Sequence, residues 1–179
     1  MTEPAVVWWL QAGSAYCDLR LPHDGVDQVM CFAGTTTWDG LRLTWHREVE
    51  LDPSLWEDVG DVGWDGPDLI ETGSVGSAGA EIGYVERWQR LPGSDHDLLA
   101  LHCDGGRIVR TGRYALTILD GCQSGGDFAA VAWRLENDDW AARFSWPPDA
   151  VAPAPPADIP RKGETVVLRD GSEWIIDER

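Results

Sequence analysis

Apolar residues recur at every second position along most of this chain, and this period limits the folds that are open to it. It is clearest in AYCDLRL at 15–21, in LRLTWHREVEL at 41–51 and in WAARFSW at 140–146. Successive side chains of a β-strand point to opposite faces, so the period predicts half-buried strands with one face on a core and the other in water. The more evenly apolar segments VVWWLQ and FAAVAW predict strands that are covered on both faces.

Turn-forming residues separate these segments. Asp39 with Gly40 and Asp170 with Gly171 each stand between two apolar segments, and Asp-Gly supplies the positive φ that a tight hairpin turn requires. No stretch carries a convincing helical stripe of apolar residues. About ten antiparallel strands joined mostly by hairpins favour a closed barrel, which leaves no strand edge exposed. The sequence therefore predicts an all-β, antiparallel barrel.

The barrel is predicted to span residues 1–146, because the linker-like segment of the chain follows it. This segment, PPDAVAPAPPADIP at 147–160, is rich in proline and alanine. Its prolines forbid a central strand and favour an extended connection. Residues 161–179 then form a hairpin that is too small to fold alone and must pack on the barrel. The prediction is a single structural unit with a docked C-terminal hairpin.

The chain carries a formal net charge of −17, from 31 acidic and 14 basic side chains, and the acids are spread over its whole length. Such a surface repels phosphate backbones and anionic membranes, so the charge argues against nucleic acid or a membrane as partner. No basic start followed by a long apolar run is present, and no stretch approaches the apolar length of a membrane span. We therefore expect a cytoplasmic protein.

The residue types that bind metals lack the required spacing. The cysteines form no CxxC pair, and the histidines form neither HxH nor HExxH. They are Cys17, Cys31, Cys103 and Cys122, and His23, His46, His96 and His102. The acidic segment DVGWDGPDLIETG at 61–73 departs from a calcium loop, because Gly63 takes the third position and Glu71 arrives one residue early. We predict no metal site and no cofactor, and interpret 61–73 as a glycine-rich loop at the rim of the barrel.

Two charged residues lie on faces that are otherwise apolar and aromatic. In AEIGYVERWQRL, Glu86 shares a face with Tyr84 and Trp88, and in the strand at 41–51 Arg47 shares a face with Trp45. A charge that faces a barrel interior is costly unless it is paired or hydrogen-bonded, so these opposite charges are able to meet inside. They form a structural ion pair, or the face is an outward one that happens to be aromatic, or they hold a polar group of a ligand in an apolar pocket.

A candidate site follows from the last of these alternatives. Its catalytic candidates are Glu86, Arg47, Tyr84 and His102. Eleven tryptophans in 179 residues are heavy usage, and several indole rings would line a flat, aromatic cavity. The ligand-binding candidates are Trp45, Trp64, Trp88, Trp133 and Glu71. Trp64, in the predicted rim loop, is expected to cap the cavity mouth.

Three segments resemble the HRI protein family, whose members are known from yeast as kinase-interacting proteins and occur in bacteria. ETGSVGSAGAEIGYVERWQRL is similar to a family pattern in which a Glu-Thr-Gly turn leads into a strand with Glu-x-Trp-Gln. The matching residues are Glu71, Thr72, Gly73, Glu86, Trp88 and Gln89 there, Lys162, Gly163, Val166, Gly171 and Trp174 in the tail, and Phe32, Ala33 and Gly34 in CFAGTTTW. The resemblance implies a calycin-like or lipocalin-like β-barrel with no established activity. The yeast kinase partnership is not carried over, since this chain shows no recognisable docking motif.

Three functions stay open at this point. The first is a soluble barrel that binds a small, partly aromatic or apolar molecule in its cavity. The second is a cofactor-independent lyase, isomerase or cyclase in the same cavity, with Glu86 as acid or base and Arg47 or Tyr84 stabilising the developing charge. The third is an acidic protein-interaction module, for which the sequence offers no basic or apolar surface run. The oligomeric state is left open, with a homodimer as one alternative.

Overall fold

The structure of the chain, a computed structural model, describes residues 5–22, 29–52, 58–75, 82–121 and 127–178. These residues form fourteen β-strands and contain no helix that has the length and apolar character of a membrane crossing. The first seven strands are β1 (Ala5–Ala12), β2 (Ala15–Pro22), β3 (Met30–Trp38), β4 (Arg42–Glu50), β5 (Asp58–Asp65), β6 (Asp68–Val75) and β7 (Ile82–Trp88). The others are β8 (Leu99–Cys103), β9 (Gly106–Thr111), β10 (Tyr114–Asp120), β11 (Phe128–Glu136), β12 (Asp139–Trp146), β13 (Thr165–Val167) and β14 (Glu173–Glu178).

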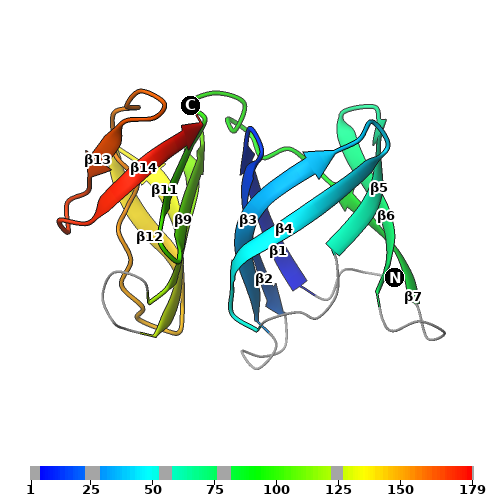
Figure 1. Ribbon diagram of the computed structural model, residues 1–179, viewed down its shortest axis with the longest axis horizontal. Coiled ribbons are helices and arrows are strands. Elements are labelled where there is room, and N and C mark those ends of the chain that lie inside the picture. The colour runs from blue at the N-terminus through cyan, green and yellow to red at the C-terminus, as the bar shows by residue number, and fades with distance from the viewer. Residues whose placement is uncertain (1–4, 23–28, 53–57, 76–81, 122–126, 179) are drawn as a thin grey trace.

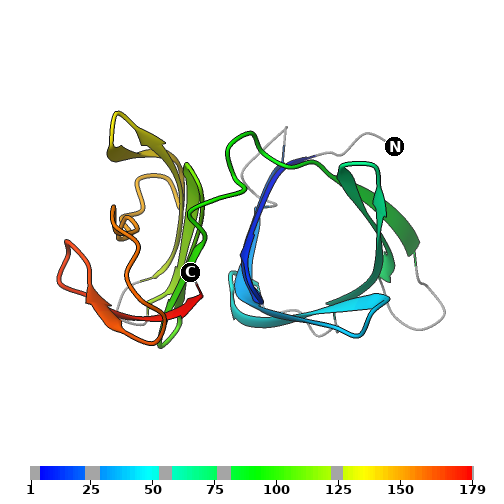
Figure 2. The ribbon, with the colours of Figure 1, turned by 90° about the horizontal axis from the view of Figure 1, so that it is seen from above.

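The strands form two curled antiparallel sheets that stand back to back (Figure 1). In the first sheet, β1 to β7 pair in chain order; in the second, the order is β12-β11-β10-β9-β8-β14-β13. Figure 2 shows that the first sheet curls almost into a ring, while the second curves the opposite way, so that two convex sides face each other. The all-β, antiparallel class predicted from the sequence is confirmed.

The predicted division of the chain needs correction. In place of one barrel over residues 1–146, the described strands form two sheets: the first ends at Trp88, and the second begins at Leu99. The C-terminal hairpin predicted at 161–179 belongs to the second sheet, because β14 pairs with β8. The period of two shows which face of a strand is apolar but not which strands are neighbours, so it does not reveal this division.

Apolar side chains on the two convex sides form the core between the sheets. From the first sheet, Ala15, Cys17 and Leu19 of β2 are almost completely buried in it. From the second sheet they meet Ala100, Val109, Leu116, Ile118, Ala130 and Ala132. Burial of a large apolar side chain contributes roughly 1.5–3 kcal/mol, so this contact fixes which side of each strand faces the core.

A bulge in β4 changes which of its side chains face this core. The register between β3 and β4 shifts next to Gly34, where Glu48 is an extra residue on β4. Such a bulge interrupts the alternation of side chains, so that Arg47 lies on the concave side while Val49 joins the core. Gly34 permits the close approach of the two strands, because a Cβ atom there would overlap the backbone oxygen of His46.

We predict that Gly34→Ala lowers the free energy of unfolding by more than about 2 kcal/mol, since the overlap is with backbone that has no room to move. Gly63→Ala in β5 is the matched control: nothing lies within 4 Å of a Cβ atom built there. Urea unfolding of both variants measures the difference. Equal stability of the two variants would show that β3 and β4 separate at no cost.

The C-terminal segments complete the second sheet and cover its concave side. Trp174 and Ile176 of β14 are buried against Leu99, Leu101 and Ile108. The proline-rich segment 147–160 runs inside the curve of this sheet (Figure 2). The Thr117 hydroxyl donates a hydrogen bond to the Pro153 carbonyl at 2.9 Å, and Arg110 Nη1 donates one to the Ala157 carbonyl at 2.9 Å. The linker is therefore a packed part of the fold.

Two neighbouring isoleucines of β14 test this packing. Ile176 is 2% exposed, whereas Ile175 is 46% exposed on the other face of the strand. We expect Ile176→Ala to lower the free energy of unfolding by about 2–5 kcal/mol, and Ile175→Ala to lower it by less than about 1 kcal/mol. Denaturant titration compares them, and a similar loss in both would mean that β14 is not held against the second sheet as described.

Candidate functional site on the concave face of the first sheet

Polar and aromatic side chains from several strands gather on the concave face of the first sheet. Positions that alternate with the core residues point away from the second sheet and into the curl. They are Tyr16, Asp18 and Arg20 from β2, Arg47 and Glu50 from β4, Asp58 from β5, Glu71 from β6, and Tyr84, Glu86 and Trp88 from β7. We call this set the inner cluster.

Arg20 connects two carboxylates of the inner cluster. Its Nη1 atom lies 2.8 Å from Glu86 Oε1, and its Nη2 atom lies 3.2 Å from Asp18 Oδ2. Asp18 is almost completely buried, while Arg20 and Glu86 keep about a fifth of their side chains exposed. The guanidinium also lies 5.7 Å from the centre of the Trp88 ring, within the range of a cation–π interaction.

Arg47 holds a second group of carboxylates. Its Nη2 atom donates a hydrogen bond to Asp58 Oδ2 at 2.6 Å, and Nη1 donates one to Glu50 Oε2 at 3.3 Å. The guanidinium stacks on the Phe32 ring at 3.9 Å from the ring centre. Both arginines of the inner cluster are thus placed between acidic groups and aromatic faces.

Glu71 is held by two donors from β7. Tyr84 Oη donates a hydrogen bond to Glu71 Oε1 at 2.7 Å, and Trp88 Nε1 donates one to Glu71 Oε2 at 2.9 Å. The space for the tyrosine comes from Gly73, since a Cβ atom at that position would lie 2.5 Å from Tyr84 Oη. Glu71 also stands directly opposite Glu86 in the register of β6 and β7, which brings two acids side by side.

Burial changes the acidity of two of these carboxyls. It raises the pKa of Glu71 to about 7; the nearby Glu86 carboxylate raises it further, while the hydrogen bonds from Tyr84 and Trp88 lower it. Burial also raises the pKa of Asp18 to about 6, against the lowering effect of Arg20. The inner cluster therefore contains groups that change charge close to neutral pH, the property required of an acid–base group.

Side chains join the two outer strands of the first sheet, β1 and β7. In the described residues these strands are not paired with each other through the backbone. The Trp9 and Trp88 rings meet edge to face, with their centres 4.8 Å apart, and Arg20 reaches Glu86 across the same gap. The curl is thus closed by a seam of side-chain contacts.

The floor of the concave face contains an unsatisfied hydroxyl. Tyr16 is fully buried between Phe32, Leu43 and Trp45, and its hydroxyl has no hydrogen-bond partner among the described residues. Burial raises the pKa of Tyr16 well above its ordinary value, so the phenol stays protonated at neutral pH. The Trp9 Nε1 donor is likewise buried and without a partner in the described part of the chain.

The structure brings most of the predicted site residues together but pairs them differently. The residues of the prediction that lie on this concave face are Glu86, Arg47, Tyr84, Trp45, Trp88 and Glu71. Glu86 and Arg47 were expected to meet; Glu86 instead pairs with Arg20, and Arg47 with Asp58 and Glu50. The segment 61–73, predicted as a glycine-rich rim loop, is instead the hairpin of β5 and β6, and Trp64, beside its turn, is 68% exposed.

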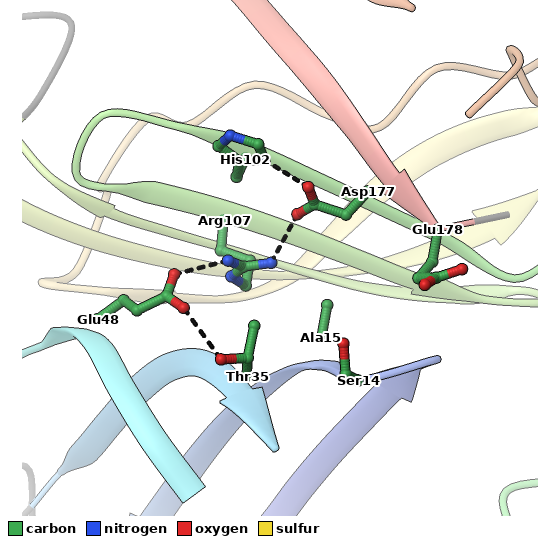
Figure 3. A pocket seen from close by; sticks show the side chains of 8 residues that line it. All are labelled: Ser14, Ala15, Thr35, Glu48, His102, Arg107, Asp177 and Glu178. Carbon is green, nitrogen blue, oxygen red and sulfur yellow. Dashed lines mark hydrogen bonds and ion pairs between the residues drawn. The ribbon is translucent and has the colours of Figure 1, made fainter. Parts of the chain in front are cut away.

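His102 lies elsewhere, in a pocket of about 420 Å³ between the two sheets (Figure 3). Its Nδ1 atom is 2.7 Å from Asp177 Oδ1. The buried Arg107 side chain lies 2.9 Å from Asp177 on the second sheet and 2.6 Å from Glu48 on the first. The pocket is lined by Ser14, Ala15, Thr35, Glu48, His102, Arg107, Asp177 and Glu178. Its charges link the sheets and are separate from the inner cluster.

Trp133 is also separate from the inner cluster. Its Nε1 atom donates a hydrogen bond to Thr117 Oγ1 at 3.0 Å, on the side of the second sheet that the proline-rich segment covers. Within the described ranges, no group of three or more His, Cys, Asp or Glu side chains is able to hold a metal ion. Cys122 and His23 lie outside those ranges.

The inner cluster contains five residues that were not predicted from the sequence: Tyr16, Asp18, Arg20, Glu50 and Asp58. In AYCDLRL the polar positions were interpreted as solvent-facing, whereas β2 is covered on both faces and its polar face lines the curl. The available signal was the combination of Tyr16, Asp18 and Arg20 on one face, because opposite charges two residues apart beside an aromatic ring suit an interior better than a plain solvated face.

We predict that Glu71→Gln reduces the pH dependence of stability. The folded protein holds the Glu71 proton up to a pKa of about 7, whereas the ordinary value is 4.5, so the free energy of unfolding falls as the pH rises through this range. The loss is on the order of 3 kcal/mol, and Gln, which cannot ionise, removes it. Asp18 contributes in the same direction between 3.8 and about 6, and this part remains in the variant.

Urea unfolding between about pH 5 and pH 8 measures this effect. Glu136→Gln, on the second sheet, is the control and should keep the wild-type slope. A Glu71→Gln slope equal to that of the wild type would contradict the buried, proton-binding environment of Glu71.

No protein-family model matches the sequence, and no curated protein sequence matches it. Among solved structures, the crystal structure of an uncharacterized protein from Saccharomyces cerevisiae is similar to this chain, with a TM-score of 0.74 and 15% sequence identity. The similarity covers 99% of this chain and 92% of the yeast protein. At this identity the comparison shows a shared fold, which includes both sheets.

Proposed function

We propose that this protein binds a small molecule on the concave face of its first sheet, in contact with the inner cluster. The observation that carries the proposal is the arrangement of charges there. Two arginines and five carboxyls stand on one face beside the Trp9, Trp45 and Trp88 rings, and several of these charges remain partly exposed. Small-molecule sites combine aromatic walls with a few fixed polar groups in this way.

The alternative is that these ion pairs only stabilise the fold. Buried ion pairs contribute little net stability, because the cost of removing the charges from water offsets most of their attraction. A purely structural cluster also has no need of the fully buried Tyr16 hydroxyl, which lacks a partner among the described residues. Perturbed pKa values, as at Glu71, occur more often at functional sites than elsewhere, which adds support.

The pocket between the sheets supports ligand binding less well. Arg107 is already bound to Glu48 and Asp177, one from each sheet, and His102 is bound to Asp177. Among the described residues that line that pocket, none is a phenylalanine, tyrosine or tryptophan. Its groups are engaged in joining the sheets, whereas those of the inner cluster lie on a face that no other sheet covers.

A ligand screen tests the proposal. We would screen a library of small aromatic and polar compounds by thermal shift, and measure the affinity of each hit by calorimetry for the wild type, Glu86→Gln and Glu136→Gln. Loss of one charge-assisted hydrogen bond corresponds to about a tenfold or greater loss of affinity. We therefore expect Glu86→Gln to weaken binding by about that factor, with Glu136→Gln unchanged. Hits that bind all three proteins equally would contradict a site at the inner cluster.

The second candidate function, acid–base catalysis of the lyase, isomerase or cyclase type, is favoured by one observation. Glu71, with a pKa of about 7, is present in both protonation states near neutral pH, and Tyr84 is placed to stabilise charge beside it. Glu71, rather than Glu86, then acts as the acid or base. Nuclear magnetic resonance of each bound compound over time tests this: conversion that is lost in Glu71→Gln supports catalysis, and unchanged compounds argue for binding alone.

We further propose that the chain belongs to the HRI family and that its first sheet is the lipocalin-like part of the fold. The residues that carry the family resemblance support this, since Glu71, Gly73, Glu86 and Trp88 all contribute to the concave face. The kinase partnership known for yeast members is not part of the proposal.

A further inference from the structure

The inner cluster has an excess of negative charge. Among the described residues its acids are Asp18, Glu50, Asp58, Glu71 and Glu86, and its cations are Arg20 and Arg47. Glu86 and Asp58 both act electrostatically on Asp18, Glu71 and Tyr84, so they belong to one electrostatic unit. Each also keeps roughly a fifth of its side chain exposed, and is thus accessible to a solute. The protein as a whole, at −17, attracts cations to this face.

Exposed tryptophans stand at one end of the same face. Trp38, 65% exposed, is the last residue of β3, and Trp64, 68% exposed, is the last but one of β5. Both strands run antiparallel to β4, so these ends lie at the same edge of the sheet (Figure 1). Trp38 pairs with Leu43, which packs on the inner face, and Trp64 is two residues from Val62, which packs on the same face. Both tryptophans therefore belong to the inner face. Large exposed rings at the rim of a polar interior mark an interaction site.

The interior already shows how it binds positive charge. Arg47 lies over the Phe32 ring and Arg20 over the Trp88 ring, with carboxylates on their other sides. The buried Tyr16 hydroxyl, with no partner in the described residues, lies within the electrostatic influence of Arg47, Asp58 and Asp18. The ammonium group of a ligand would be bound in the same way as these guanidinium groups, between aromatic faces and carboxylates.

We propose that the ligand of the inner cluster is an organic cation with a flat, apolar body. Its body lies against Trp64 at the rim, and its ammonium group is bound by the Glu86 carboxylate. These two residues are near each other in the register, since Trp64 pairs with Leu69 and Leu69 with Trp88, two residues from Glu86. This inference rests on the proposed binding function and specifies the class of molecule that is bound. It excludes organic anions of the same shape, because the carboxylate excess repels them.

Three indoles that differ in charge form a matched set of probes: tryptamine is cationic, tryptophol is neutral and indole-3-acetate is anionic. We expect calorimetry to show binding of tryptamine, binding of tryptophol that is weaker by about tenfold or more, and no binding of indole-3-acetate. Added salt should weaken tryptamine binding, because the attraction is between charges that are partly exposed. Glu86→Gln should weaken tryptamine binding about tenfold and tryptophol binding by a smaller factor, because tryptophol offers the carboxylate no positive charge.

Two further variants locate the site. Trp64→Ala removes an exposed ring, is expected to fold normally, and should weaken tryptamine and tryptophol to a similar extent. Val167→Ala, an exposed apolar residue of the second sheet, is its control and should have no effect. Tryptamine binding that is insensitive to both Glu86→Gln and Trp64→Ala would place the compound elsewhere and overturn the inference.

The results separate this inference from the binding function on which it rests. If tryptophol or indole-3-acetate binds as tightly as tryptamine and Glu86→Gln weakens that binding, the concave face is a ligand site but its preference for cations is wrong. If none of the three indoles binds, the cation inference is overturned, and the compound screen alone decides whether the inner cluster binds another class of molecule.

Discussion

The back-to-back contact between the two sheets determines which side chains are left for function. Apolar residues of β1 to β3 bury their side chains against β8 to β11, and this burial is the largest favourable term available to the fold. Every alternate residue of β1 to β3 must then point into the curl of the first sheet. Tyr16, Asp18 and Arg20 are therefore interior residues because Ala15, Cys17 and Leu19 are core residues.

Charged side chains inside the curl need partners of opposite charge or hydrogen-bond donors there. In this structure each arginine of the inner cluster pairs with two carboxylates. One guanidinium serves Asp18 and Glu86, and another serves Asp58 and Glu50. Among the described residues Glu71 is paired with no arginine; two neutral donors hold it, and burial raises its pKa to about 7. Arg107 pairs with carboxylates of both sheets and so connects them, whereas Arg47 pairs with carboxylates of the first sheet.

The sequence is informative about strands and faces, and less so about their partners. The period of two locates the strands and places Glu86, Tyr84 and Trp88 on one face, and the structure has them on one face. It does not distinguish a solvated polar face from an interior one, so Asp18 and Arg20 were missed. The partners of Glu86 and Arg47 depend on how far the sheet curls, which brings β7 to β2 across 66 residues of sequence. No local sequence pattern indicates that two residues so far apart in the chain become neighbours.

The sequence pattern also did not reveal the partner of His102. Its strand has an apolar face, and the histidine was expected to contribute to the cavity of a single barrel. The division into two sheets places it beside Asp177, from a strand that follows it by 75 residues. Trp133 is likewise on the second sheet, next to the proline-rich segment. The partner of His102 follows from the strand order of the second sheet, in which β14 lies beside β8.

The seam between β1 and β7 has a consequence for motion. A closed barrel opens only by breaking a ladder of backbone hydrogen bonds, whereas this seam is held by the contact of Trp9 with Trp88 and of Arg20 with Glu86. Breaking such contacts costs a local free energy that is far below that of global unfolding. The first sheet is therefore able to widen and narrow as a unit while its strand pairing stays intact. Amide hydrogens on the seam edges of β1 and β7 would then exchange with solvent faster than those of β2 and β3, which are paired on both sides.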